Sequence, residues 1–392
     1  AFAGPMLRPS GIDSGGFHFR GDSSNGKTTA LRVAASVYGG ASYLQRWRAT
    51  DNALEAIAAQ HCDGLLILDE LAQVDPKTAG ECAYMLANET SKARSTRTGQ
   101  TRPRLNWRLL FLSAGEIGLA AHMAEGGKRA RAGQELRMAD VPADAGAGLG
   151  ILEELHGQEH GAALVQYLAK ASEAQHGTAG RAFLEWAVSH AAELRDRMRA
   201  AVDRLAAQWV PDAASGQVDR VARRFAVVAA AGELATEAGI TGWPEGEATR
   251  AAKACFHAWL DSRGGIGNAE DVQMLRQVRR FFEAHGEGRF THWDRAERDD
   301  DHAPKTLHRA GFRKPVKGIA AELTGWEFYV LKETFRSEIC EGFDYKAVLR
   351  VLREREYLEA DKGRPFDCKP RLPGLGPTAC YCIKSAILEG DT

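Results

Sequence analysis

The stretch Gly21-Asp22-Ser23-Ser24-Asn25-Gly26-Lys27-Thr28 decides the fold of this chain. It matches the pattern G-x-x-x-x-G-K-[ST], and its flanks suit that pattern, because Gly16–Arg20 reads as a strand and Thr29–Tyr38 as a helix. In such a loop the backbone N–H groups and the start of the helix hold phosphate oxygens. We therefore expect Gly21 through Thr29 to bind ATP, with Lys27 at the β- and γ-phosphates and the Thr28 hydroxyl on Mg²⁺.

A second motif is an apolar run that ends in two carboxylates, Leu65-Leu66-Ile67-Leu68-Asp69-Glu70. A fully apolar strand is typical of a parallel sheet that is buried on both faces. The carboxyl ends of such strands meet at one edge, where ligands bind. We expect Asp69 to hold the magnesium shell and Glu70 to polarise the attacking water. The alternative interpretation is a solvated strand end without a chemical role.

A third apolar strand, Leu109–Ser113, ends in a polar residue. Ser113 would lie between the two carboxylates and the γ-phosphate, so it is our candidate for a residue that senses the phosphate. The alternative is that this serine merely ends the strand. With Leu136–Val141 as a further strand, the alternation of strands and amphipathic helices predicts an α/β fold built on a parallel sheet.

Between the second and third strands lies a basic segment, Ser91–Arg108. It has no acidic residue, and Thr98-Gly99-Gln100-Thr101 at its centre predicts a hairpin tip. Such a local field suits a nucleic-acid backbone, although a charge run can also be a solvated face. The residues that we expect to contact DNA are Lys92, Arg94, Arg97, Arg102 and Arg104.

Two arginines precede the strand Leu136–Val141, in Lys128-Arg129-Ala130-Arg131. In a ring of ATPases this segment would face the nucleotide of the neighbouring subunit. There Arg129 or Arg131 could stabilise transition-state charge in trans. A surface ion pair is the alternative role.

Several of these stretches together resemble a known family. Gly15–Tyr38, the strand that ends in Asp69–Glu70, Arg129–Glu135 and Ala139–Pro142 are similar to the helicase-like family called domain of unknown function 927. That family occurs in prophages and mobile elements, often beside primase modules, and is related to superfamily 3 and poxvirus-type primase-helicases within the AAA+ class.

The resemblance implies a hexameric ring that hydrolyses ATP and unwinds or translocates on DNA while its element replicates. It also implies that the basic segment is a hairpin in the central channel. In addition, it implies that an arginine of a helical lid senses the nucleotide, for which the candidates are Arg220, Arg223 and Arg224.

The remaining sequence predicts two further parts. From residue 149 to 265, Ala-rich segments with apolar residues at three- and four-residue spacing predict a helical lid. From 266 to 392 we expect short helices, then a helix at Tyr345–Tyr357 and strands at Leu358–Ala360 and Cys380–Ile383, which is typical of a winged helix or of a small lid subdomain. The predicted domains are thus an AAA+ P-loop core at 1–148, a lid at 149–265, and a linker with a winged-helix-like domain at 266–392.

Composition restricts the class of protein. Lys and Arg number 51 against 52 Asp and Glu, so DNA binding would need locally clustered charge. The seven scattered cysteines suit reduced thiols, and a zinc site at Cys368, Cys380 and Cys382 is disfavoured because there is no C-x-x-C pair. No signal peptide or bilayer-spanning run is present, so we expect a cytoplasmic protein. The lack of a first methionine suggests the carboxyl-terminal part of a longer chain.

The combined prediction is an ATP-dependent DNA helicase or translocase. One alternative is an AAA+ loader or switch that binds DNA and hydrolyses ATP without unwinding. Another is a P-loop kinase for a small molecule. The kinase would need a substrate pocket and a mobile lid in place of the basic hairpin, and it would leave Arg129 and Arg131 without a partner.

Overall fold

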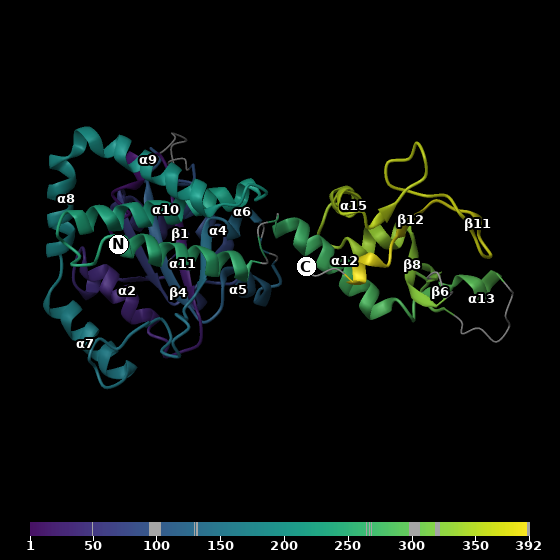
Figure 1. Ribbon diagram of the computed structural model, residues 1–392, viewed down its shortest axis with the longest axis horizontal. Helices are drawn as coiled ribbons and strands as arrows, with labels where there is room; N and C mark the ends of the chain where they lie inside the picture. The colour runs from purple at the N-terminus through teal and green to yellow at the C-terminus, as the bar shows by residue number, and fades with distance from the viewer. Residues whose placement is uncertain are drawn as a thin grey trace, which may run out of the picture. The chain divides into compact units, whose positions relative to one another are not determined.

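The computed structural model describes residues 1–48, 50–93, 103–128, 130, 132–263, 265, 267, 269–297, 306–317 and 322–389 (Figure 1). The chain forms two compact units, Ala1–Ile266 and Gly267–Thr392.

A parallel sheet of five strands forms the centre of the first unit. Its order is β2-β3-β4-β1-β5, and every neighbouring pair is parallel. The strands are β1 (Gly15–Arg20), β2 (Gln45–Arg46), β3 (Gly64–Asp69), β4 (Leu109–Gly115) and β5 (Met138–Pro142). The predicted parallel sheet is therefore present. The short edge strand β2 was not predicted, and β5 begins two residues later than expected.

Successive residues of the central strands point to opposite faces of the sheet, as a pleated strand requires. Leu65 and Ile67 of β3 belong to one buried cluster, whereas Leu66 and Leu68 belong to another. Both faces are thus covered by apolar side chains, which explains why the β3 sequence is apolar without alternation.

Helices cover each face of the sheet. The Leu65 face packs against α2 (Lys27–Ser36), α8 (Thr178–Ser189), α9 (Ala191–Trp209), α10 (Gly216–Glu237) and α11 (Glu247–Ser262). Figure 1 shows α9, α10 and α11 in front of β1 and β4. The Leu66 face packs against α3 (Asp51–Gln60), α4 (Ala79–Ala87) and α5 (Leu119–Glu125). Shorter elements are α1 (Leu7–Ser10), η1 (Ala41–Tyr43), η2 (Leu71–Gln73) and α6 (Ala132–Glu135).

The region predicted as a lid is helical from α7 (Gly161–Ala174) to α11 and lies in the same compact unit as the sheet. Helix α8 is docked closely on the end of α2. The Gly180 N–H donates to the Val37 carbonyl at 2.9 Å, and a Cβ on Gly180 would lie 2.3 Å from that oxygen. That these helices act as a lid stays a prediction.

The second unit contains a five-stranded sheet of order β6-β7-β8-β12-β9. The strands are β6 (Phe290–His292), β7 (Gly311–Lys317), β8 (Leu323–Leu331), β9 (Leu358–Glu359) and β12 (Cys380–Ile383). Its helices are α12 (Ala269–His285), α13 (Trp293–Glu297), α14 (Lys332–Thr334), the π-helix η3 (Phe335–Ile339), α15 (Tyr345–Glu354) and α16 (Ala386–Glu389). A small ribbon pairs β10 (Arg371–Leu372) with β11 (Gly376–Pro377).

After residue 266 the structure has the predicted short helices, among them α13, α14 and α16, but it also has two elements that were not predicted. The structure has one helix of 17 residues, α12, and a long antiparallel pair, β7 with β8. Proline is unfavourable inside a strand, and Pro315 within β7 concealed the strand pattern. The predicted strands near Leu358 and Cys380 do pair, but within this larger sheet. A winged helix is therefore not confirmed.

Two further predictions concern the cysteines and the membrane. All seven cysteines are free thiols. Among the described residues, no group of three or more His, Cys, Asp or Glu is arranged to hold a metal ion. In the same part of the chain, none of the helices combines the length and the apolar character needed to span a bilayer.

Candidate functional site

The glycine-rich loop joins β1 to α2 at the carboxyl edge of the sheet. Two of its residues, Ser24 (φ 69°) and Gly26 (φ 83°), adopt left-handed backbone conformations, which turn the chain sharply before α2 begins at Lys27. The buried Lys27 ammonium folds back over the loop. It donates to the carbonyl oxygens of Gly21 at 2.7 Å and Asp22 at 2.5 Å. The loop thus surrounds a positive charge.

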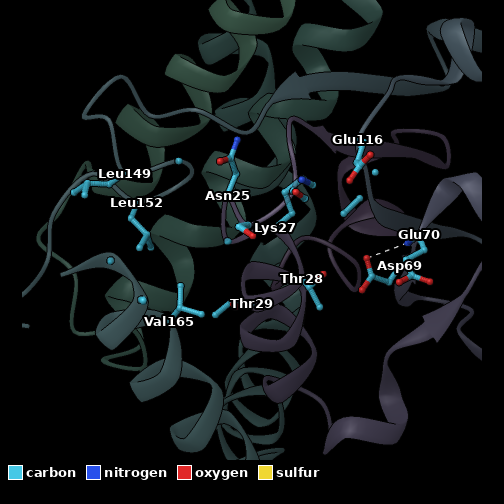
Figure 2. A pocket seen from close by; sticks show the side chains of 18 of the residues that line it. Asn25, Lys27, Thr28, Thr29, Asp69, Glu70, Glu116, Leu149, Leu152 and Val165 are labelled. Atoms are coloured by element: carbon cyan, nitrogen blue, oxygen red, sulfur yellow. Dashed lines mark hydrogen bonds between the residues drawn. The ribbon is translucent and has the colours of Figure 1, made fainter.

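A cavity of about 1110 Å³ lies over this loop. Ser23 to Thr29 line its centre. Figure 2 shows that the other labelled side chains separate into two groups on either side of Lys27 and Thr28. Leu149, Leu152 and Val165 stand on one side, and Asp69, Glu70 and Glu116 stand on the other. The cavity therefore has an apolar end, a cationic centre and an acidic end.

The acidic end is built by the ends of β3 and β4. Asp69 is buried, and one of its carboxylate oxygens accepts the Glu70 N–H at 3.0 Å. Glu70 itself has a left-handed backbone (φ 59°), so its side chain leaves the strand direction and is exposed. The Glu70 carboxylate accepts a hydrogen bond from Gln73. Two adjacent carboxylates thus face the cavity with different degrees of burial, the more buried one next to the sheet.

Glu116 is a cavity residue that the sequence reasoning missed. It follows the last residue of β4 and is exposed. Ser113, the predicted sensor, does not line the cavity, because it is fully buried within the strand. Its hydroxyl accepts the Trp47 indole N–H at 2.7 Å and lies 3.0 Å from Nδ1 of His18. Glu116, three residues further on, lines the cavity on the same side as Asp69 and Glu70.

The apolar end is formed by the loop after β5 and by α7, neither of which carries a recognisable motif. The Ile151 N–H donates to the Asn25 carbonyl at 3.0 Å, which ties this loop to the glycine-rich loop. Gly150 allows the contact, because its φ is 64° and a Cβ there would lie 2.6 Å from the Asn25 oxygen. Val165 of α7 completes the apolar wall. A flat apolar group of moderate size can pack at this end.

Among the described residues, the arginines that were predicted to sense the nucleotide from the lid do not line the cavity. Arg129 and Arg131 lie outside the described residues, so their roles stay predictions. Of the lid candidates, Arg223 is paired with Asp203 and Asp219. Arg224 is buried, and its guanidinium donates to the Leu136 carbonyl at 2.9 Å. Neither these two nor Arg220 contributes to the cavity lining.

The base of the predicted hairpin is an antiparallel pair of segments. The Ser91 N–H donates to the Leu105 carbonyl at 2.9 Å, and the Trp107 N–H donates to the Glu89 carbonyl at 3.0 Å. Thr90 and Asn106 form the bridge between these bonds. Lys92 and Arg104 adjoin this base and are exposed, whereas Arg94, Arg97 and Arg102 lie outside the described residues.

The hairpin base is anchored at the amino edge of the sheet. The Glu89 carboxylate accepts hydrogen bonds from Ser14, just before β1, and from Arg108, just before β4. The indole N–H of the buried Trp107 donates to the Leu86 carbonyl at 2.9 Å. Since the glycine-rich loop follows β1 at its other end, the cavity and the hairpin base belong to opposite edges of one sheet.

Comparisons with known proteins found a family match for part of the chain and a solved structure with a similar fold. Residues 1–106 match the family described as "Domain of unknown function (DUF927)". No curated protein matches the sequence. The chain is similar to a solved structure described as "SCCmec type IV Cch - active helicase", with 17% sequence identity and a TM-score of 0.67. The match covers 99% of this chain and 67% of that one. At this identity the similarity concerns the fold.

Proposed function

We propose that this chain is an ATP-dependent DNA helicase or translocase of the AAA+ type. The observation that carries the proposal is the order of groups in one cavity, which runs from an apolar end through the glycine-rich loop to the acidic end. ATP has the same order of parts, with an apolar base, a triphosphate and a terminal phosphate that water attacks. The carboxyl edge of a parallel sheet is also where nucleotides bind in such folds.

The residues of the cavity fit ATP and Mg²⁺. Lys27 now donates to two backbone carbonyls, and we infer that it exchanges them for phosphate oxygens on binding. The Thr28 hydroxyl and the Asp69 carboxylate are hard oxygen ligands of the kind that Mg²⁺ prefers. When bound there, Mg²⁺ supplies positive charge to the phosphate oxygens. Asp69 remains next to the sheet in this role because it is held by the Glu70 N–H.

The exposed Glu70 is our candidate for the residue that orients the attacking water. Its left-handed backbone turns the carboxylate out of the strand, and Gln73 holds it there. A positioned carboxylate can accept a proton from water as the new bond forms. Glu116 stands at the same end of the cavity, and its carboxylate can accept the second hydrogen bond of that water.

The DNA-binding role rests on the hairpin between β3 and β4. An antiparallel base with Lys92 and Arg104 beside it supports the predicted basic hairpin, whose other cations are Arg94, Arg97 and Arg102. Cations at this density bind phosphates without reading sequence. The fold similarity to a helicase supports the same role. We further propose that the chain forms a homo-oligomeric ring, completed in trans by Arg129 or Arg131, which serves replication of a mobile element beside a primase.

A strand-displacement assay on forked DNA tests the proposal. The native chain should release the labelled strand only with ATP and Mg²⁺, and Glu70→Gln should bind the fork without releasing the strand. If ATP is hydrolysed and DNA is bound but no strand is released at any fork geometry, the chain is a loader or switch. If DNA neither binds nor stimulates ATP hydrolysis, the helicase proposal is wrong and a small-molecule kinase becomes the better reading.

A further inference from the structure

A row of polar side chains crosses the otherwise apolar sheet beneath the cavity. His18 of β1 is in register with Ser113 of β4 on one side and with Asp140 of β5 on the other. His18 and Ser113 are fully buried. Polar groups are costly to bury without partners, so the hydrogen bonds that His18 and Ser113 make are important for the fold.

The donor and the acceptor of each hydrogen bond in this row can be assigned. The Trp47 indole N–H donates to Oγ of Ser113 at 2.7 Å. Nε2 of His18 lies 3.1 Å from the Ile117 carbonyl oxygen, which can only accept, so Nε2 carries the hydrogen. Burial lowers the pKa of His18 to about 4, so its ring is neutral at pH 7 and Nδ1 has a free lone pair. Nδ1 then accepts the Ser113 O–H at 3.0 Å, which completes a chain from Trp47 to Ile117.

Within this chain, His18 is the residue that holds the turn that carries Glu116. His18 bonds Ser113, which lies within β4 three residues before Glu116, and Ile117, the residue just after Glu116. Gly115 packs directly on the imidazole, because a Cβ there would lie 3.0 Å from Cε1 of His18. Further along, the Asp140 carboxylate accepts the Leu119 N–H. The segment after β4 is thus held from β1 and from β5.

His18 is also connected to the glycine-rich loop through the backbone of β1. His18 lies on β1, three residues before Gly21, and the rest of β1 is paired with β4 on one side and β5 on the other. We propose that His18 is a positioning residue that fixes Glu116 relative to the glycine-rich loop, so that the carboxylate meets the water that attacks the terminal phosphate. This inference rests on the proposed ATPase function and assigns His18 no contact with the nucleotide.

Kinetics of single and double variants of the full chain test the coupling. Glu116→Gln should lower kcat by about ten-fold or more in the native background but by less than about two-fold in the His18→Phe background, because the carboxylate is then already misplaced. His18→Phe should lower kcat while KM for ATP stays within about three-fold. His18→Gln, which keeps one donor and one acceptor, should recover most of the activity.

Trp47→Phe is the matched control, because it also removes a buried hydrogen bond from Ser113 but leaves His18 bonded to Ile117. Its kcat should stay within about two-fold of the native value, even if its melting temperature falls. Independent, multiplicative effects of His18→Phe and Glu116→Gln would overturn the inference. An equal loss of kcat in Trp47→Phe would also overturn it, since general destabilisation would then explain both variants.

The tautomer of His18 gives a readout that does not depend on turnover. Nitrogen-15 NMR of the native chain at pH 7 should show a neutral ring with its hydrogen on Nε2. A hydrogen on Nδ1 would overturn the inference alone, because the chain from Trp47 to Ile117 would then run differently. The expected tautomer without any ATP turnover would overturn the proposed function and, with it, the role of Glu116.

Discussion

Replacing Asp140 by asparagine should stabilise the protein at neutral pH, although the change removes a charge close to Arg20. One carboxylate oxygen of Asp140 is buried and makes no hydrogen bond within the described part of the chain. The carboxylate also accepts the Leu119 N–H, and Arg20 lies near it. Burial outweighs these two favourable effects and raises the pKa of Asp140 to about 6 from an ordinary value of 3.8.

The raised pKa sets the magnitude and the sign of the effect. The folded protein holds a proton on Asp140 that the unfolded chain loses, so this contribution to stability is complete below pH 3.8 and is lost as pH rises through about 6. A change from 3.8 to about 6 corresponds to about 3 kcal/mol. Asparagine keeps the acceptor for Leu119 and cannot ionise, so Asp140→Asn should gain about 1–3 kcal/mol at pH 7.5.

His18 contributes the opposite slope over nearly the same range of pH. Its pKa is lowered from 6.5 to about 4, chiefly by burial and further by nearby Arg20, Lys27 and His122. The stability that it contributes is present above pH 6.5 and is lost as pH falls through about 4. The two slopes partly cancel in the native protein, and the difference between the native chain and Asp140→Asn isolates that of Asp140.

Urea unfolding followed by tryptophan fluorescence between pH 4 and 7.5 measures that difference. We expect the advantage of Asp140→Asn to be near zero at pH 4, to grow through pH 6 and then to level off. A variant that is less stable than the native protein by the same amount at every pH would show that burial does not destabilise the charged Asp140 carboxylate.

Three further outcomes follow from the structure and the proposed function. Alanine at Arg94, Arg97 and Arg102 should flatten the slope of log affinity for single-stranded DNA against log salt concentration by about 2, at about 0.7 per cation. Alanine at Lys369 and Arg371 of the second unit should change that slope less. An alanine variant of Arg131 or Arg129 should bind ATP without hydrolysing it and regain activity when mixed with Glu70→Gln, and no recovery in rings that exchange subunits would contradict a role in trans. Gly180→Ala should lower the free energy of unfolding by about 1–3 kcal/mol, because its Cβ would meet the Val37 carbonyl oxygen at 2.3 Å. Gly216→Ala, with nothing within 4 Å of its Cβ, is the control for that measurement.

The centre of the site could be predicted because its residues lie in short motifs, and the order of the elements in these motifs determines where the side chains lie. A strand, the glycine-rich loop and a helix must follow one another to hold phosphate, and an apolar strand that ends in Asp69 and Glu70 reaches the same edge. Turn residues in the basic segment also predicted a hairpin, whose antiparallel base is present while its tip lies outside the described residues. These features depend on neighbours in the sequence.

The remainder depends on contacts between distant segments. The sequence does not show how far β4 continues before it leaves the sheet, so Ser113 was chosen and Glu116 was missed. The partners of Ser113 come from β1 and from the segment after β2, which no local pattern connects to it. The apolar end, with Leu149 and Leu152, lies in a loop that is held by contacts with distant segments, among them a hydrogen bond to Asn25 and an ion pair between Glu153 and Arg250.

In the proposed function, the cavity binds ATP through Lys27 and hydrolyses it through Glu70. The most direct test is to measure bound ATP and released phosphate for Glu70→Gln, with Lys27→Ala measured in parallel. We predict that Glu70→Gln binds ATP within a few-fold of the native affinity and loses turnover by about 10²-fold or more, whereas Lys27→Ala loses binding or turnover. Undiminished phosphate release by either purified variant would contradict this prediction.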